Sequence, residues 1–532
     1  MARDMVQVRA GSRAQFRAPQ VSIGRSQFNG SHEIKTTFDA SYLIPIANWE
    51  VLPGDTFTCD LDGFCRVFSP LDAPIMDNIE LETFFFFTPT RLLWDNWEAM
   101  NGAHDAAGAQ DTDYTVPRMT SGLTVSNDQG TGVAQLAGYL GLPHGLTSAG
   151  MNFSALPFRN YQFVYSEWFR DQNLIDQVVH ATDNGPDTPG NYQLLKSAKK
   201  HGYFTSALPY LQKGDPVTVP IGTRATINYD AAVGTAPVVY STSASAYRNL
   251  DSSGPDLLVD STSAGSGTPN SQEIYADLTT ATGVSVNALR ESVAIQRLLE
   301  RDARGGTRYT EMLYSQFGVT SPDFRLQRPE YLGGGRSWIN VSPVANTSDT
   351  ASVDQGELRG IGTGVIRGHG WAKSFTEHGY ILGLVRARGD ITYFQGVDKL
   401  WTRSTRYDFY IPALANLGEQ SILNKELYYS NSPATDDLVF GYQERWAEYR
   451  SMRSRITGTF DPNVTGSLSF WHLAEDFASL PSLNQTFIED QTPMSRVTTV
   501  DTEHDFLMHL RFNLKMARPI PVYSVPSLMP RF

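Results

Sequence analysis

The wide spacing between segments that favour β-strands constrains the fold more than any other feature. Three β-rich runs lie between residues 33 and 88, and further runs follow only at residues 374–395, 455–472 and 505–516. Strands so far apart can share a sheet only if long excursions leave the core and return. A double-sheet jelly roll tolerates such excursions, because its loops gather at the sheet ends. We therefore expect a mainly β, antiparallel jelly roll with large loop insertions.

Three segments carry more specific predictions of local structure. The unbroken aromatic run Phe84–Phe87 ends an alternating strand pattern, which predicts a strand that is buried on both faces. Residues 161–171 and 286–303 are predicted helices inside the excursions. In the second helix Arg290, Arg297 and Arg301 share one face. That face is either simply solvated or directed at a neighbouring subunit.

The charge balance limits the partners of the chain. Its formal net charge is −13, which argues against a freely nucleic-acid-binding protein. The first 30 residues are the exception, with five arginines against one aspartate, a net charge of +4. These candidate contacts to nucleic acid or to an inner surface are Arg3, Arg9, Arg13, Arg17 and Arg25. No window approaches the about 20 apolar residues of a membrane span, so we expect no membrane insertion.

Composition also divides the chain. Residues 216–285 contain no Phe, Trp or Lys, are rich in Ser, Thr, Ala and Gly, and carry a net charge of −4. A flexible linker could have this composition, but the recurrent β-branched runs favour a folded, exposed lobe. We expect an interior-facing basic arm at 1–30, the first part of the jelly roll with insertions at 31–215 and a surface insertion at 216–285. The second part of the jelly roll, with insertions and a C-terminal arm, is expected at 286–532.

The residues offer no clear catalytic, cofactor or metal constellation. The glycines at 333–335 and at 360, 362 and 364 lack the context of a phosphate-binding loop, which favours turns or close backbone approaches. His369, Glu377 and His378 could in principle bind a metal ion, yet ordinary loop and strand positions explain them as well. We expect no catalytic residue, no cofactor and no metal.

Three further features have plain structural interpretations. Glu475 and Asp476 imitate a glycosidase acid pair, but adjacent residues on a strand point to opposite faces. Cys59 and Cys65 are expected to be reduced thiols in a strand region. The aromatic- and arginine-rich segments at 400–412 and 441–455 have the composition of subunit interfaces, although amphipathic packing could produce it too.

Long stretches of the chain resemble a known family. They include SHEIKTTFDASYLIPI, RLLWDNWEAMNG, LPFRNYQFVYSEWFRDQN, FGVTSPDFRLQRPEYLGGG and FGYQERWAEYR, and they run from Ser31 to Pro526 with a gap near 216–285. The chain is similar to the major capsid proteins of gokushovirus-type microviruses, which are small icosahedral bacteriophages with single-stranded DNA. The resemblance implies an eight-stranded jelly roll of the viral capsid type.

The resemblance also implies a function and partners. About 60 copies would form a T=1 shell around a circular single-stranded DNA genome, with the 216–285 insertion rising around the threefold axes towards the host. Expected partners are further copies of the chain, the packaged DNA, a small basic DNA-binding virion protein, a DNA pilot protein, a scaffolding protein and a host-surface receptor. The expected location is the virion, after assembly in the bacterial cytoplasm. The alternative is a carbohydrate-binding or glycan-cleaving jelly-roll protein.

Overall fold

The computed structural model divides the chain into two compact units. Unit 1 comprises Met1–Pro209 and Ser321–Phe532, and unit 2 comprises Tyr210–Thr320. Within the described residues, no helix is long and apolar enough to cross a membrane. The described residues are 24–103, 114–120, 122–147, 153–215, 217, 226–229, 238–241, 246–253, 256–264, 274–277, 286–306, 308–319, 326–347 and 355–523.

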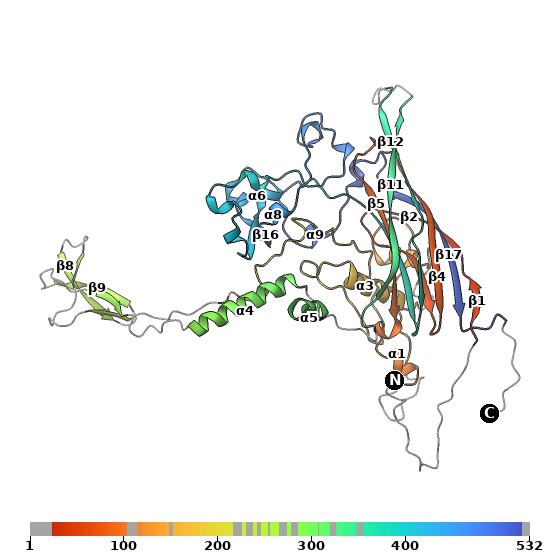
Figure 1. Ribbon diagram of the computed structural model, residues 1–532, viewed down its shortest axis with the longest axis horizontal. Coiled ribbons are helices and arrows are strands. Elements are labelled where there is room, and N and C mark those ends of the chain that lie inside the picture. Colours follow the sequence, from red (N-terminus) through yellow and green to blue (C-terminus); the bar gives the residue numbers. More distant parts are fainter. Residues whose placement is uncertain are drawn as a thin grey trace, which may run out of the picture. The chain divides into compact units, whose positions relative to one another are not determined.

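A curled, ten-stranded antiparallel sheet forms the centre of unit 1 (Figure 1). The strand order is β1-β17-β4-β12-β11-β5-β14-β3, with β2 pairing with β17 and β13 with β4. This arrangement confirms the predicted jelly-roll class, with ten strands in the sheet where eight were expected. The strands are β1 (Ser26–Asn29), β2 (His32–Phe38), β3 (Ile44–Val51), β4 (Thr56–Val67), β5 (Ile79–Pro89), β11 (Glu330–Ala345), β12 (Leu358–Ile366), β13 (Trp371–Ser374), β14 (Gly379–Gly389) and β17 (Phe506–Arg518).

Short elements in unit 1 lie in the excursions between these strands. A separate two-stranded sheet pairs β15 (Glu419–Leu423) with β16 (Val439–Glu444). The predicted helix at 161–171 is present as α3, which begins five residues earlier than expected. The α-helices are α1 (Trp97–Met100), α2 (Val133–Tyr139), α3 (Leu156–Trp168), α6 (Asn424–Leu427), α7 (Pro433–Asp436), α8 (Ala447–Arg450) and α9 (Gln485–Ile488).

The sequence identified most, but not all, of the sheet. The runs before residue 88, the run at 374–395 and the run at 505–516 contain strands, but residues 455–472 do not. That segment forms irregular backbone with two 3₁₀ turns, Gly458–Phe460 and Ser469–Trp471, because its amides bond locally rather than to a neighbouring strand. Strands β11 and β12 were missed, because glycines lower their strand propensity.

Those glycines permit close backbone approaches. A Cβ atom on Gly334 would lie 2.0 Å from the carbonyl oxygen of Thr83 on β5, and one on Gly360 would lie 2.9 Å from that of Ala73. Both distances are far shorter than an ordinary van der Waals contact. The expectation of close approaches is confirmed at these two positions.

Large aromatic side chains fill the hollow of the curled sheet. Trp49 on β3 packs edge-on against Phe512 on β17 at 5.3 Å between ring centroids, and Phe512 also meets Phe85 on β5 at 6.3 Å. Cys59 and Cys65 are buried, free thiols among them. Burial raises the pKa of each thiol to about 12, so both stay protonated. The ring contacts bring β3, at one end of the strand order, against β17, next to the other end.

Strands β5 and β14 are covered on both faces. All eleven positions of β5 are buried except Phe84, which is half-buried, so the prediction for Phe84–Phe87 is confirmed. On the face away from the hollow, Phe84 and Phe86 pack against Phe169, at 5.1 Å and 5.7 Å between centroids. Helix α3 adds the hydroxyl of Tyr161, which donates a 2.9 Å hydrogen bond to the Leu43 carbonyl. The excursions therefore seal this half of the sheet.

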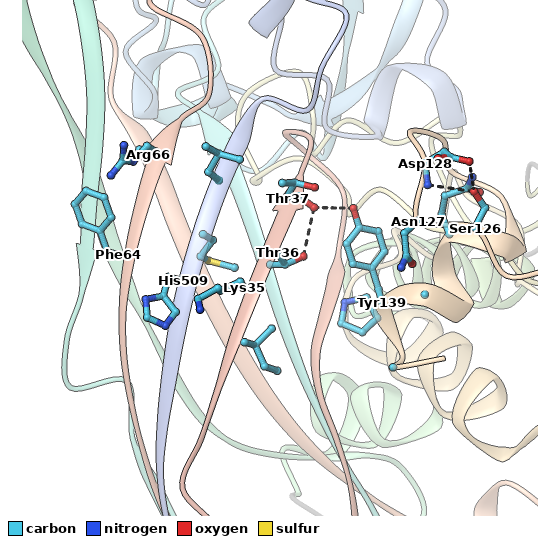
Figure 2. Close-up of a pocket in the computed structure, with 17 residues that line it drawn as sticks. Lys35, Thr36, Thr37, Phe64, Arg66, Ser126, Asn127, Asp128, Tyr139 and His509 are labelled. Atoms are coloured by element: carbon cyan, nitrogen blue, oxygen red, sulfur yellow. Dashed lines mark hydrogen bonds between the residues drawn. The ribbon is translucent and has the colours of Figure 1, made fainter. Parts of the chain in front are cut away.

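The other half of the sheet has one open face. Along β17, residues buried in the hollow alternate with exposed ones, and β4 shows the same alternation. The exposed side chains of Lys35, Phe64, Arg66 and His509 stand on neighbouring strands (Figure 2). We call this surface the open face.

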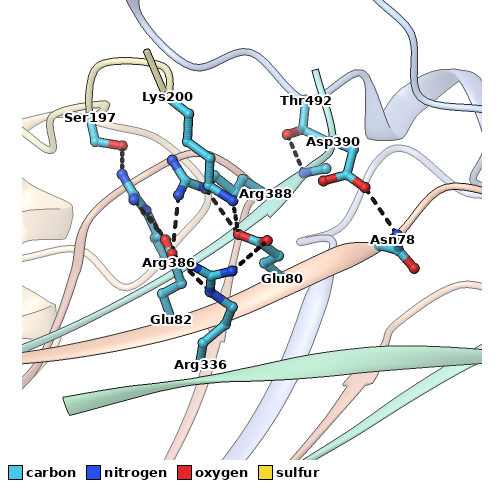
Figure 3. Close-up of polar contacts among 11 residues, drawn as sticks. Asn78, Glu80, Glu82, Ser197, Lys200, Arg336, Arg386, Arg388, Asp390 and Thr492 are labelled. Atoms are coloured by element: carbon cyan, nitrogen blue, oxygen red, sulfur yellow. Dashed lines mark hydrogen bonds and ion pairs between the residues drawn. The ribbon is translucent and has the colours of Figure 1, made fainter. Parts of the chain in front are cut away.

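A ladder of buried charges crosses β11, β5 and β14 on their covered face (Figure 3). Glu82 accepts hydrogen bonds from Arg386 Nε at 2.8 Å and from Arg388 Nη2 at 3.1 Å. Glu80 pairs with Lys200 and with Arg336. Burial opposes the ionisation of Glu82, but the two guanidinium groups outweigh it and hold its pKa below the usual value. The ladder satisfies charges that the sealed half would otherwise bury alone.

Unit 2 contains the compositionally unusual segment. It holds helix α4, in agreement with the helix predicted at 286–303, and a sheet pairing β7, β8 and β9. The apolar side chains of Ile295 and Leu298, opposite the arginines, are not covered by the described part of this unit. The unit extends beyond the predicted insertion at both ends. Its elements are β6 (Thr226–Tyr229), β7 (Val238–Ser241), β8 (Ala246–Ser253), β9 (Asp256–Ala264), β10 (Ile274–Asp277), α4 (Val286–Arg304) and α5 (Tyr309–Phe317).

Removing one charge from the ladder should be costly. Glu82→Gln leaves the buried guanidinium group of Arg386 without its counter-charge and Arg388 with Glu80 alone, and we expect a loss of about 3–5 kcal/mol in the free energy of unfolding. Urea unfolding followed by tryptophan fluorescence measures it. The control is Asp437→Asn, which removes a surface pair with Lys425 and should cost less than about 1 kcal/mol. Equal losses for the two variants would contradict the importance of the ladder.

A carboxyl group at the junction of β2 and β17 should make stability depend on pH. Burial raises the pKa of Asp505 to about 6, and its carboxylate accepts a 2.9 Å hydrogen bond from the Ala40 amide. Because the folded state binds this proton more tightly than the unfolded chain, its contribution is present at low pH and is lost as pH rises from about 4 to about 6. The hydrogen bond to Asp39 raises the pKa of His504, which acts in the same direction.

The measurement is calorimetry of the native chain and of Asp505→Asn between pH 4 and pH 7. We expect the difference in melting temperature between the two proteins to change steadily across this range, to the disadvantage of the native chain at higher pH. The exposed Asp501→Asn serves as the control. A constant difference between the native chain and Asp505→Asn would show that Asp505 does not titrate in this range.

Candidate functional site

Two segments of unit 1, residues 400–410 and 449–452, expose several large aromatic and other apolar side chains, and the rings of Tyr410 and Tyr449 join them at 6.3 Å between centroids. Trp401 is 76% exposed, Tyr407 68% and Met452 95%. Soluble monomers rarely leave such a concentration of large apolar groups in water, whereas subunit interfaces are enriched in them. We call this cluster the aromatic surface. Its members are Leu400, Trp401, Tyr407, Phe409, Tyr410, Tyr449 and Met452.

The backbone below the aromatic surface is held firmly. Trp446 is buried and donates a 3.0 Å hydrogen bond to the Leu414 carbonyl, and Tyr410 packs edge-on against its ring. Arg403 lies over the ring of Tyr449, 4.4 Å from the centroid, and forms an ion pair with Glu448. The exposed rings therefore project from an ordered base, which lowers the entropy cost of docking a partner on them.

A tight turn at Arg406–Asp408 orients Tyr407. The carboxylate of Asp408 accepts hydrogen bonds from the amides of Thr405 at 2.7 Å and Ser404 at 3.0 Å. These backbone hydrogen bonds, together with one from the Thr405 hydroxyl, lower the pKa of Asp408 to about 2. Asp408 is therefore ionised at neutral pH, where its carboxylate accepts these hydrogen bonds.

The open face carries a second candidate site. Beside it lies a cavity of about 750 Å³, lined on one side by residues of β2, β4 and β17 and on the other by α2 and the loop before it (Figure 2). The hydroxyl of Tyr139 on α2 donates a 2.8 Å hydrogen bond to the Thr37 carbonyl, which anchors α2 to the edge of β2. The walls include Lys35, Arg66 and His509.

The structure describes only one of the predicted basic residues of the arm. Arg3, Arg9, Arg13 and Arg17 lie outside the described residues. Arg25, the residue before β1, is described, and its guanidinium group donates a hydrogen bond to the Thr56 hydroxyl. Strand β1 pairs with the end of β17, where Ser26 lies opposite Arg518. Residues 26–29 of the predicted arm thus belong to the sheet, and the role of the arm stays a prediction.

The residues considered for metal binding have structural contacts instead. His369 is buried between the Thr83 hydroxyl, 2.8 Å from its Nδ1, and the Ser337 hydroxyl, 3.1 Å from its Nε2. Glu377 forms an ion pair with Arg91 at 2.7 Å, and His378 packs edge-on against a tryptophan ring. In the part of the chain that the structure describes, no three potential ligands cluster around a possible metal position.

The two adjacent carboxylates considered as an acid pair have different partners. Glu475 forms an ion pair with Lys199 at 2.6 Å, and Asp476 accepts a 2.8 Å hydrogen bond from Gln395. Burial raises the pKa of Glu475, although Lys199 opposes the shift. Each group is thus committed to a structural contact, and the glycosidase interpretation loses its geometric basis.

Sequence reasoning found the aromatic surface but missed the open face. The segments 400–412 and 441–455 were recognised by composition, and both contribute exposed rings. The open face lies on β2, β4 and β17, and only the register of the sheet shows that these strands are neighbours. The alternation of exposed with buried residues along β4 and β17 was the signal in the sequence that could have indicated it.

Comparisons with known proteins agree with this architecture. Residues 17–528 match the family described as capsid protein (F protein) of phages. Capsid protein VP1 of Bdellovibrio phage phiMH2K is 43% identical, with 97% of each chain covered. Capsid protein VP1 of Chlamydia phage 1 is 37% identical over 96% of each chain, and that of Spiroplasma virus 4 is 31% identical over 95% of this chain and 96% of its own.

The resemblance to gokushovirus-type capsid proteins is thereby confirmed. The match spans the curled sheet, the excursions that seal it and the aromatic surface alike. This chain belongs to the phage capsid protein (F protein) family, and its role is that of a major capsid protein.

Proposed function

We propose that about 60 copies of this capsid protein close into a T=1 icosahedral shell around a circular single-stranded DNA genome. The aromatic surface is the observation that carries this proposal, because it presents large apolar side chains from an ordered base. A closed shell covers such a surface on every subunit and leaves no growing edge. The role is structural, and the chemistry is that of repeated non-covalent contacts.

The surface insertion and the N-terminal arm have different roles in this proposal. The insertion at 216–285, which lies within unit 2, forms protrusions around the threefold axes and contacts a host receptor. The arm at 1–30 faces the interior. About 60 copies at −13 each carry roughly −780 formal charges, so basic groups must face the DNA if it is to be held.

Other virion components complete the assembly. A small basic DNA-binding protein and a DNA pilot protein share the interior, and a scaffolding protein guides assembly in the host cytoplasm before the virion is released. These partners follow from the family resemblance. An acidic coat protein supplies few phosphate contacts of its own, which supports a division of labour with a basic partner.

Replacing exposed rings should prevent shell formation without unfolding the subunit. Trp401→Ser combined with Tyr407→Ser removes two of the most exposed rings of the aromatic surface, and we expect at least a tenfold rise in the protein concentration at which particles form. Analytical sedimentation and electron microscopy measure particles, and circular dichroism measures folding. The control is Met76→Ser, which removes an apolar side chain that is 69% exposed elsewhere. Normal particles from the double variant would contradict the assignment.

Neutralising the arm should reduce packaged DNA. Changing Arg3, Arg9, Arg13 and Arg17 together to Gln removes four positive charges and leaves the length of the chain unchanged. We expect particles of normal size whose ratio of absorbance at 260 nm to 280 nm falls, since fewer phosphates are neutralised. The matched control changes the same positions to Lys, which keeps the charge. An unchanged ratio in the Gln variant would exclude the arm as a DNA contact.

A further inference from the structure

The register of the sheet places one row of exposed side chains across the open face. His509 on β17 lies directly opposite both Lys35 on β2 and Phe64 on β4. Phe64 in turn lies opposite Val365 on β12. Strand β11 continues the row with Trp338, because its neighbour Ile339 pairs with the residue before Val365. With about 4.8 Å between strands, the two rings stand roughly 10 Å apart.

Both rings are accessible, and each is accompanied by an arginine. Phe64 is 38% exposed and Trp338 45% exposed. The guanidinium carbon of Arg66 lies 5.3 Å from the Phe64 centroid, and that of Arg336 lies 6.0 Å from the Trp338 ring. Each ring offers a base a stacking surface, and Arg66 also offers the adjoining phosphate a counter-charge. Arg336 is already paired with Glu80, so at Trp338 the ring alone is available to the ligand.

The charge of this face runs against that of the whole chain. Its carboxylates are Glu33, which lies 3.1 Å from His509 Nε2, Asp62, which accepts a hydrogen bond from Asn513, and Asp60. In the register, Glu33 and Asp62 lie opposite Arg511. Among the described residues, no carboxylate lies within ion-pair distance of the four cations that β2, β4 and β17 present here. Those cations are Lys35, Arg66, Arg511 and Lys515.

We propose that the open face is a binding platform for single-stranded DNA. Bases stack on Phe64 and Trp338, and the backbone phosphates lie along Lys35, Arg66 and Arg511. The proposal rests on the proposed function, because a shell around such a genome supplies the ligand. A second copy of the chain is a poorer occupant, since covering four unpaired cations with protein would cost more than the exposed rings return. Every base has a face to stack, so the platform binds without sequence preference.

The experiment measures binding of a fluorescein-labelled 30-mer of deoxythymidine to the purified full chain over a range of salt concentrations. Phe64→Leu with Trp338→Leu keeps apolar bulk but removes both rings, and we expect at least tenfold weaker binding with an unchanged salt dependence. Lys35→Gln with Arg66→Gln should instead reduce the slope of log affinity against log salt by about 0.7 per cation. The control is Phe317→Leu, which removes a 71% exposed ring of unit 2 and should bind as the native chain does.

A second readout keeps the result independent of folding. Photocrosslinking with bromodeoxyuridine in the same 30-mer should attach DNA to the peptides that contain Phe64 or Trp338. Native affinity in the double-leucine variant, or crosslinks confined to other peptides, would overturn the proposal. Protection of Trp338 from hydroxyl radicals in shells emptied of DNA would assign the face to a second copy and overturn it as well.

These outcomes separate the platform from the shell. If particles never form but the full chain binds the 30-mer through Phe64 and Trp338, the proposed function fails and the platform stands. If particles form and package DNA while the double-leucine variant binds normally, the platform fails and the proposed function stands.

Discussion

The rest of the structure depends on the burial of β5 and β14 on both faces. A strand covered on both sides needs a second packing layer, and the excursion after β5 supplies it through Phe169 and the buried side of α3. The charge ladder of Glu80, Glu82, Arg386 and Arg388 lies within that layer. Because ion pairs in such a place are stable only when every partner is present, the excursions cannot shift without exposing the ladder. The excursions therefore behave as part of the core.

This arrangement divides the sheet into a sealed half and an open half. The excursion after β5 seals the first half. The excursion after β14 is tied to the end of that strand by a 2.9 Å hydrogen bond from the Gly389 amide to the Thr492 hydroxyl, and it presents the aromatic surface from an ordered base. Strands β2, β17 and β4 have no such cover on their outer face, and their alternate side chains remain in solvent. A single sheet can thus offer one surface for contacts between subunits and another for a different ligand.

How far the sequence predicts this structure depends on whether the determining contact is local. The strand at Phe84–Phe87 and the helix at 286–303 follow from local periodicity and were predicted well. Strand β11 was missed because it contains Gly334. A larger residue there would clash with the Thr83 carbonyl on β5, and no local pattern reveals this contact between strands. The charge ladder could not be predicted for the same reason. Its carboxylates alternate along β5 and its guanidinium groups along β14, and only the register of the sheet shows that the two strands pair. The open face was missed for the same reason, whereas the amino-acid composition alone was enough to predict the aromatic surface.

Arginine over an aromatic ring occurs at both surfaces, and the difference between them lies in the partners of the arginine. At the aromatic surface, Arg403 stacks on Tyr449 and also pairs with Glu448, so its charge is already neutralised when a neighbouring subunit covers it. On the open face, Arg66 stacks on Phe64 with no carboxylate within ion-pair distance among the described residues. Covering the first arrangement with protein costs little desolvation, whereas the second is stabilised most by a ligand that brings its own negative charge. The same pair of side chains can therefore serve protein contact on one surface and phosphate contact on the other.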